Sequence, residues 1–437
     1  MDTKKLRQKI LDLAIRGKLV PQDPNDEPAS VLLERIRAEK EQLIKEGKIK
    51  RSKKSAATDK SHYENVPFEI PENWCWTTLG EVFTLQAGKN ITAKEISDKE
   101  DTIYPFPCYG GNGLRGYVSS YNRTGRFPLI GRQGALCGNI NVADGLFYAT
   151  EHAVVVESYC NIDVDWAVYA LIYLNLNQYA TSTAQPGLSV ATINEVLLPV
   201  PPIDEQKRIA NEIEKWFDLI KEIESGKVEL KSYIKQTKSK ILDLAISGKL
   251  VPQDPEAEPS IELLKRINPD FEPCDNSHYE NLPECWKEIA MGEICKLYDG
   301  EKVSGPSLTY IDVKYLRGSK VGEFVTSGKY VPQGSTLILV DGENSGEVFT
   351  TPIDGYQGST FKILGISGHL DKEYVLLLIK RSQKLLRENK VGSAIPHLNK
   401  KMFKELIVPV PPLAEQKRIV AIVNMLLYKL DIITAEL

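Results

Sequence analysis

An internal repeat limits the possible folds of this 437-residue chain more than any other feature of its sequence. Five blocks occur twice in the same order, which chance does not produce at this length. The longest pair is ILDLAIRGKLVPQDP at residues 10–24 and ILDLAISGKLVPQDP at residues 241–255. The other pairs are residues 27–36 and 258–267, SHYEN at 61 and at 277, Trp74 with LGEV and Trp286 with MGEI, and residues 198–209 and 408–419.

The displacement between the two copies changes along the chain. It is 231 residues at the N-terminal block and 210 residues at the last block. On these displacements Leu437 corresponds to Lys227 and Met1 corresponds to Ser232, so the two chain ends together repeat the central segment. A linear tandem duplication would give one constant displacement. We therefore expect a circularly permuted repeat with pseudo-two-fold symmetry and with termini that lie close together.

The central segment and the chain ends share a long heptad pattern. Between residues 209 and 244, eleven positions alternate in steps of four and three, and nine of them are apolar. A repeat of 3.5 residues keeps one stripe of a helix facing a partner helix, as in a coiled coil. The same stripe continues in residues 419–437 and 3–13. We expect two long antiparallel coiled-coil segments that act as rigid spacers, and an amphipathic helix lying on a globular core is the alternative.

Two regions of nearly equal length and unlike sequence lie between the helical segments. Short β-rich runs alternate in them with glycine-containing loops, and a helix-like stretch follows late in each region, which predicts mixed α/β domains. The expected strands include residues 127–131, 153–158, 335–340 and 361–366, and the expected helices are 165–177 and 372–390.

Loops rich in Gly, Asn, Gln, Ser and Arg occur at matching stages of the two regions. Arg, Asn and Gln make bidentate contacts to base edges, and glycine lets the backbone approach a phosphate. A single loop of this kind is more often an ordinary surface turn, but the set is a candidate for two DNA-reading surfaces. The candidate contact residues are Lys89, Asn90, Asn112, Arg115, Arg132, Gln133, Gln185, Lys302, Arg317, Ser319, Lys320, Asn344, Ser345, Ser393 and His397.

Composition and motifs argue against several other classes of protein. The seven cysteines include no CxxC pair, which argues against a zinc site and a disulfide framework, and no run is apolar enough for a membrane span. Without a signal-peptide core, the chain is expected in the cytoplasm. It contains no GxxxxGK[ST] loop, no glycine-rich signature for S-adenosylmethionine and no ligand spacing among its five histidines. We therefore expect no catalytic, cofactor-binding or metal-binding residue.

The repeated motifs resemble those of the specificity subunits of type I restriction–modification systems. The resemblance is carried by PVPPxxEQKRI after each variable region, PENW with LGEV before the first, and the ILDLAxxGKLVPQ helix ends. It implies two target-recognition domains, each reading one half of a bipartite asymmetric DNA site, and spacers that fix the gap. It also implies two modification subunits docked on the spacers, which methylate adenine with S-adenosylmethionine, and restriction subunits that use ATP and Mg²⁺.

The resemblance and the repeat together divide the chain into five parts. These are an N-terminal spacer half with a connector (1–60), a first target-recognition domain (61–202), a central spacer with a connector (203–276), a second target-recognition domain (277–412) and a C-terminal spacer half (413–437). The second domain departs from the pattern with PECW in place of PENW. The first copy has a basic insertion near residues 48–54, which is either a solvated linker or a loop that contacts phosphate or a partner.

The charge of the two variable regions differs. Residues 75–198 contain 7 Lys or Arg against 11 Asp or Glu, whereas residues 287–408 contain 17 against 14. Because phosphate contacts supply most non-specific DNA affinity, we expect the isolated chain to bind DNA weakly and to gain affinity with its partner subunits. An interaction scaffold with two ligand-binding domains and no DNA contact is the main alternative function.

Overall fold

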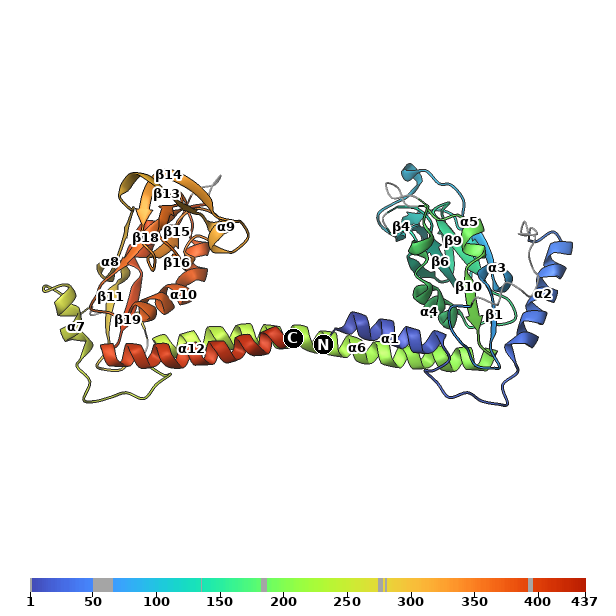
Figure 1. Ribbon diagram of the computed structural model, residues 1–437, viewed down its shortest axis with the longest axis horizontal. Coiled ribbons are helices and arrows are strands. Elements are labelled where there is room, and N and C mark those ends of the chain that lie inside the picture. The colour runs from blue at the N-terminus through green and yellow to red at the C-terminus, as the bar shows by residue number, and fades with distance from the viewer. Residues whose placement is uncertain are drawn as a thin grey trace. The chain divides into compact units, whose positions relative to one another are not determined.

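The computed structural model describes residues 2–49, 66–134, 136–181, 187–273, 278–279, 281–391 and 396–437. The chain divides into two compact units, Met1–Gly226 and Lys227–Leu437, and the boundary falls within one long helix, α6 (Ile203–Ile246). Both units are of mixed α/β structure, as the sequence predicts (Figure 1). No helix among the described residues is long and apolar enough to cross a membrane.

The first unit combines the first part of α6 with two further long helices and a β-rich domain. A four-stranded sheet in the order β2-β9-β6-β7 and a second sheet in the order β4-β3-β8-β5 make up this domain, and the antiparallel pair β1-β10 connects it to the helices. The remaining elements are α1 (Thr3–Ile15), α2 (Ala29–Lys45), β1 (Cys75–Thr78), α3 (Leu79–Val82), β2 (Thr84–Ala87), η2 (Ala93–Glu95), β3 (Phe106–Gly110), β4 (Gly113–Val118), β5 (Arg123–Thr124), β6 (Phe127–Gly131), β7 (Ile140–Ala143), β8 (Leu146–Ala149), β9 (Ala153–Glu157), α4 (Val164–Leu174), η3 (Leu176–Tyr179), α5 (Val190–Asn194) and β10 (Leu197–Val200).

The second unit repeats this architecture with different residues. Its four-stranded sheet has the equivalent order β12-β18-β15-β16, its second sheet closes as β13-β14-β17, and the pair β11-β19 takes the place of β1-β10. Its elements are α7 (Ser260–Ile267), β11 (Lys287–Ala290), α8 (Met291–Ile294), β12 (Cys295–Tyr298), β13 (Lys302–Ile311), α9 (Val313–Leu316), β14 (Glu323–Val331), β15 (Thr336–Leu339), β16 (Val348–Thr350), β17 (Gly355–Gln357), β18 (Phe361–Ile366), α10 (Lys372–Glu388), α11 (Lys400–Glu405), β19 (Ile407–Val410) and α12 (Leu413–Glu436).

Most of the expected elements form where the sequence places them. The predicted strands 127–131 and 361–366 coincide with β6 and β18, and the other two differ at their ends by one residue. The predicted helix 165–177 is shorter in the structure, because Asn175 adopts a left-handed backbone conformation with a φ of 45° and ends α4.

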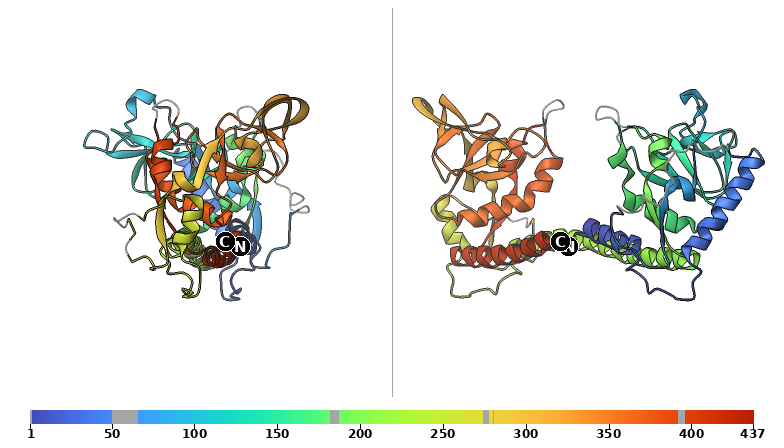
Figure 2. Two further views of the ribbon diagram at one scale, coloured as in Figure 1. Left: turned by 90° about the vertical axis from the view of Figure 1, so that its left-hand side faces the viewer. Right: turned by 45° about the vertical axis from the view of Figure 1, so that its right-hand side comes forward.

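A terminal helix lies beside α6 in each unit and runs in the opposite direction (Figure 2). In the first unit, Arg7 of α1 pairs with Glu224 at 2.9 Å, while Gln22, which follows α1, reaches Glu205 near the start of α6. In the second unit, Lys238 pairs with Asp431 of α12, and the Lys227 Nζ donates to the carbonyl of Leu437 at 2.9 Å. The direction of pairing within each unit is therefore antiparallel.

Beyond Ile209, which is 1% exposed, the heptad stripe of α6 in the first unit is buried at only one of its two repeating positions. Ile213 and Ile220 are 1% exposed, whereas Trp216 is 42% and Ile223 is 38% exposed. The reason is that α6 packs against two helices at once in the first unit, since Ile213 shares a cluster with α1 and α4. The buried stripe faces the junction of these two helices, and the neighbouring heptad position turns outward.

The repeated Glu-Gln-Lys-Arg motif connects α6 to the rest of the first unit. The Trp74 indole N–H donates to Glu205 at 2.9 Å, and the Gln22 amide donates to the second oxygen of the same carboxylate at 2.5 Å. Glu205 is 1% exposed, and its burial raises the pKa of the carboxyl group, although both hydrogen bonds oppose this shift. Next to it, the Gln206 side chain accepts from the backbone N–H of Asp163, the N-cap of α4.

The second copy of the motif makes the same contacts. Glu415 accepts from the Trp286 indole at 3.1 Å and from the Gln253 amide at 2.7 Å, and Gln416 accepts from the backbone N–H of Asp371, the N-cap of α10. The repeated blocks therefore join the helices to each domain, which is a structural reason for their close similarity in the two copies.

Candidate nucleic-acid interface

Four loops of the first unit meet at one edge of its β-rich domain. They are the β3–β4 turn at Gly110–Gly113, the loop after β6 that contains Gln133, the turn from Thr150 to His152 before β9, and the segment at Gly187. The Arg132 backbone N–H donates to the His152 carbonyl at 3.0 Å, and Gln133 forms a β-bridge with Gly187. Lys89 forms a further bridge with Thr150. We call these four loops, together with the segment at Lys89 and Asn90, the first edge.

Glycine allows the loops of the first edge to approach one another. A Cβ atom on Gly111 would lie 3.1 Å from the carbonyl oxygens of both Gln133 and His152, and one on Gly131 would lie 1.9 Å from the carbonyl oxygen of Gly111. A side chain at Gly131 therefore does not fit. The glycines of the predicted loops have a packing role as well as any role toward a ligand.

The first edge contains most of the residues predicted to contact DNA in this unit. Lys89, Asn90, Asn112 and Gln133 are exposed on its loops. Arg115, also exposed, lies on β4 beside Gly110. Arg132 is half-buried, and Gln185 lies outside the described residues.

Two residues of the first edge were not among the sequence candidates. Glu151 and His152 lie side by side, with the His152 Nε2 3.1 Å from a Glu151 oxygen. The other Glu151 oxygen, the His152 Nδ1 and the Arg132 Nε are buried and have no hydrogen-bond partner among the described residues. Buried polar atoms are usually satisfied, so a group of three unsatisfied ones calls for an explanation.

The second unit has an equivalent edge, formed by the loop after β15 and the segment around His397. The His397 Nδ1 lies 2.7 Å from an Asp341 oxygen, and Asp341 forms a β-bridge with His397. The Gly342 backbone N–H donates to the carbonyl of Pro396 at 2.8 Å. Asn344 lies in the same loop and is half-buried. We call this region the second edge.

The two edges share one backbone frame. Four backbone hydrogen bonds of the first edge have counterparts on the second edge. The donor and the acceptor of each counterpart lie 208 residues further along the chain. On the first edge the donor–acceptor pairs are Arg132–His152, Cys137–Gly134, Gly138–Gly131 and Asn139–Leu136. In the same order, their counterparts on the second edge are Val340–Thr360, Ser345–Gly342, Gly346–Leu339 and Glu347–Asn344. The glycines at the turns also share positive φ values, 89° at Gly134 and 104° at Gly342.

This shared frame explains the placement of Ser345, which the sequence suggested as a DNA contact. Ser345 is 0% exposed and occupies the position of the buried Cys137, so its hydroxyl faces the interior and not the surface of the edge. The Ser345 position supports the loop, and we do not include it in the proposed surface. Ser393 lies outside the described residues.

The remaining candidates of the second unit lie partly outside the second edge. Arg317 forms an ion pair with Glu347, which follows the Asn344 loop. Lys320 pairs with Glu323 at 2.9 Å and with Asp312 at 3.6 Å, and the Ser319 hydroxyl donates to the carbonyl of Lys314. Lys302 starts β13 and stands opposite Lys329 of β14. The basic insertion is described only up to Ile49, so its predicted role falls largely outside the described residues.

Asp299, in the loop before Lys302, binds two lysines. Its carboxylate lies 2.9 Å from the Lys329 Nζ and 2.5 Å from the Lys362 Nζ, and it accepts from the Gln357 amide. Burial acts to raise the pKa of Asp299, but these hydrogen bonds and charges outweigh it and lower the pKa to about 2.

Replacing Asp299 by asparagine is expected to weaken the dependence on pH, in acid, of the free energy of unfolding of the second unit. A carboxyl group with a lowered pKa stabilises the folded state above its unfolded pKa of 3.8, and this contribution is lost as the pH falls toward about 2. Urea unfolding between pH 4.5 and 2 measures the effect, with Glu301→Gln, at an exposed site in the same loop, as the matched control. An unchanged pH dependence in Asp299→Asn would contradict this assignment.

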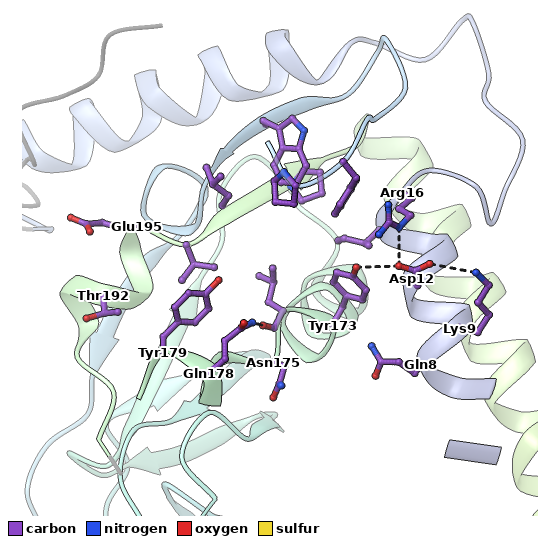
Figure 3. A pocket seen from close by; sticks show the side chains of 18 of the residues that line it. Gln8, Lys9, Asp12, Arg16, Tyr173, Asn175, Gln178, Tyr179, Thr192 and Glu195 are labelled. Atoms are coloured by element: carbon purple, nitrogen blue, oxygen red, sulfur yellow. Dashed lines mark hydrogen bonds and ion pairs between the residues drawn. The ribbon is translucent and has the colours of Figure 1, made fainter. Parts of the chain in front are cut away.

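The first unit also contains a cavity of about 1000 Å³ between α1, the end of α4, α5 and β10 (Figure 3). Asp12 accepts hydrogen bonds on its wall from Arg16 at 2.8 Å and Tyr173 at 3.2 Å. The Trp76 ring packs against Phe68 with a centroid distance of 5.0 Å. None of the candidate DNA contacts that the structure describes lines this cavity.

The second unit has a different residue at the position of Trp76. Glu288 stands there, and its carboxylate accepts from the backbone N–H groups of His278 and Tyr279 at 2.9 Å. These two contacts hold His278 and Tyr279 of the second SHYEN copy. The first SHYEN copy lies outside the described residues.

No group of three or more His, Cys, Asp or Glu residues in the described part of the chain is arranged to hold a metal ion. The edges combine polar and charged side chains on glycine-containing loops, an arrangement that suits recognition of base edges. The sequence did not point to Glu151 and His152. The shared frame leaves only one mark in the sequence: the spacing between Gly134 and Gly138 recurs between Gly342 and Gly346.

Comparison with known proteins identifies a family. The domain described as "Type I restriction modification DNA specificity domain" matches residues 71–231 and again residues 283–437. The EcoAI specificity subunit of Escherichia coli is 28% identical over 421 residues, which cover 78% of this chain and 70% of that protein. The EcoprrI specificity subunit, also from Escherichia coli, is 49% identical over 146 residues, which cover 33% of this chain and 36% of that subunit.

Solved structures show the same fold. The HsdS subunit from Thermoanaerobacter tengcongensis has a TM-score of 0.54 at 17% identity and covers 85% of this chain and 93% of its own. A chain from a structure concerning complex assembly and conformational transition of the type I R-M system has a TM-score of 0.58 at 16% identity, covering 85% of this chain and 94% of its own.

Proposed function

The chain belongs to the family of type I restriction–modification DNA specificity proteins, and from this premise we propose that it gives a type I complex its DNA sequence specificity. Each domain reads one half of a bipartite asymmetric target through its edge. The observation that carries this proposal is the pair of edges, which share one backbone frame but present different side chains. Two unlike readers on equivalent frames account for a target whose halves differ.

We further propose that the helical segments act as the spacer, as antiparallel coiled coils related by a pseudo-two-fold axis. The antiparallel contacts of α6 with α1 and with α12 support this proposal. A helix of 44 residues such as α6 is about 66 Å long at 1.5 Å per residue. A rigid helix of this length makes the distance between half-sites part of the specificity, as in dimeric DNA-binding proteins.

The proposed partners supply the chemistry. Two modification subunits dock on the helical segments and methylate adenine with S-adenosylmethionine, and restriction subunits add ATP- and Mg²⁺-dependent translocation and cleavage. Exposed apolar side chains on the helices, such as Trp216 at 42% and Tyr428 at 66%, give such partners a surface to bind. This chain acts as the non-catalytic subunit of the complex in the cytoplasm.

Co-expression with a type I adenine methyltransferase subunit tests the proposed function. We expect adenine methylation at a single bipartite motif in the host genome, and none when the methyltransferase subunit is expressed alone. Sequencing that detects methylated adenine in single DNA molecules measures both. A stable complex that methylates no defined motif would favour the alternative, a scaffold with two ligand-binding domains and no DNA contact.

A further inference from the structure

We infer that four side chains on each edge determine which bases that domain reads. On the first edge they are Arg132, Gln133, Glu151 and His152. On the second edge they are Asp341, Ser359, Thr360 and His397. The inference rests on the proposed function and adds to it the residues that distinguish one half-site from the other.

The shared frame separates residues that hold the loops from residues that differ. The turn glycines Gly134 and Gly138 and the buried Cys137 have counterparts of the same kind, namely Gly342, Gly346 and Ser345. At the same displacement of 208 residues, the surface positions change completely. Gln133 is replaced by Asp341, Glu151 by Ser359 and His152 by Thr360. Two domains that read different sequences require loops of the same backbone structure with different side chains on their surface.

The carboxylates on the edges indicate contact with bases. Glu151 on the first edge and Asp341 on the second are carboxylates, which repel a phosphate group. A carboxylate accepts hydrogen bonds from the amino groups of cytosine and adenine, and Arg132 and Gln133 supply donors for guanine and adenine. The first edge can therefore pair with several atoms of a base edge, and its exposed Lys89 and Arg115 can contact the DNA backbone.

The unsatisfied polar atoms of the first edge point to the same role. Arg132, Glu151 and His152 each keep one buried polar atom without a partner among the described residues. Such atoms destabilise the folded protein. The rest of the His152 and Glu151 side chains is accessible, at 39% and 33%, so these residues can contact a ligand. Val340, the counterpart of Arg132, is an apolar residue with 3% exposure, so the second edge lacks this donor.

On the second edge, His397 and Asp341 take the corresponding place. The position of His397 matches that of Gly187. Gly187 forms a β-bridge with Gln133 after β6, and His397 forms the equivalent bridge with Asp341 after β15. The contact of 2.7 Å between the His397 Nδ1 and an Asp341 oxygen fixes the imidazole ring, so that its second nitrogen can face a base. The second domain therefore reads with the His397–Asp341 pair, Ser359 and Thr360. The first domain reads with the His152–Glu151 pair, Arg132 and Gln133.

Methylation maps of single-edge variants test the inference in the full chain with its methyltransferase partner. Gln133→Ala and Glu151→Gln alter the first edge, and Asp341→Asn and His397→Gln alter the second. Gln178→Ala, at an exposed glutamine of the same unit that is not one of the proposed reading residues, is the matched control for Gln133→Ala. The parent protein establishes first that a bipartite motif is methylated.

We expect each edge variant to lose roughly tenfold in preference for at least one base of one half-site, with the other half-site and the gap unchanged. The first-edge and second-edge variants must affect opposite halves, and Gln178→Ala must keep the parent motif. If the parent methylates a bipartite motif but Gln133→Ala and Glu151→Gln leave every base preference intact, the inference is wrong while the proposed function stands. Changes in both halves from one variant would also overturn it. A parent that methylates no bipartite motif would instead contradict the proposed function itself.

Discussion

Replacing Trp74 by alanine is expected to lower the free energy of unfolding of the first unit by about 3–5 kcal/mol, the cost of truncating a large buried aromatic side chain. Trp74 is 4% exposed, and its indole N–H donates to the buried carboxylate of Glu205. The substitution removes the ring from the core and leaves the Glu205 carboxylate with one hydrogen bond fewer. Both effects destabilise the junction between α6 and the domain.

Hydrogen exchange resolves this effect because it reports on each unit separately. We expect faster exchange in peptides from β1 and β10 of Trp74→Ala, and unchanged exchange in β11 and β19 of the second unit. Trp216→Ala is the matched control, since Trp216 lies in the same unit but is 42% exposed, and we expect it to cost less than about 1 kcal/mol. Equal effects of the two substitutions would mean that the Trp74–Glu205 contact does not hold the junction.

The repeat predicted the architecture well because equivalent sequence blocks build equivalent contacts. Trp74 and Trp286 were recognised as a pair in the sequence, and the structure shows each bonded to the glutamate of its Glu-Gln-Lys-Arg motif. The contact itself was not predicted, since residues more than 100 positions apart leave no local pattern that names their partner.

The heptad pattern predicted the long helix but not its environment. Ile220 and Ile223 satisfy the same 3.5-residue repeat, yet one is buried and the other is 38% exposed. Periodicity identifies an apolar stripe, whereas the choice of which half of that stripe is covered depends on α4, whose position comes from the tertiary fold.

The edges were predicted in part. Glycine-containing loops indicated Gln133 and His397, which lie on equivalent frames in the structure. Glu151 and His152 were missed because they directly precede a strand and carry no glycine or amide signal, and Ser345 was selected although it is buried. Exposure at a loop position is set by the packing of neighbouring loops and cannot be deduced from residue type.

Exchanging one domain for the other within this chain is expected to change the symmetry of the DNA target. In the variant, residues 287–408 replace residues 75–198, so both domains carry the second edge. The junctions fall in the antiparallel pairs β1-β10 and β11-β19, which have equivalent registers, Cys75 opposite Val200 and Lys287 opposite Val410. Trp74, Glu205 and Gln22 stay in place, so the hydrogen bonds among these three residues are retained.

The expected consequence follows from the proposed pseudo-two-fold axis. Two identical readers related by such an axis recognise an inverted repeat, because operator symmetry mirrors protein symmetry. The second half-site should therefore appear twice, in opposite orientations, and the first half-site should disappear. As a control, replacing residues 75–198 by the corresponding region of another family member should change the first half-site alone.

The most direct test of the account is the genome-wide adenine methylation motif of the chain with two second domains, compared with that of the parent, each with the same methyltransferase subunit. The account predicts an asymmetric bipartite motif for the parent and a symmetric one, built from two inverted copies of the second half-site, for the variant. Retention of the parent motif by an assembled variant complex, or a new motif in which neither half matches the parent's second half-site, would contradict it.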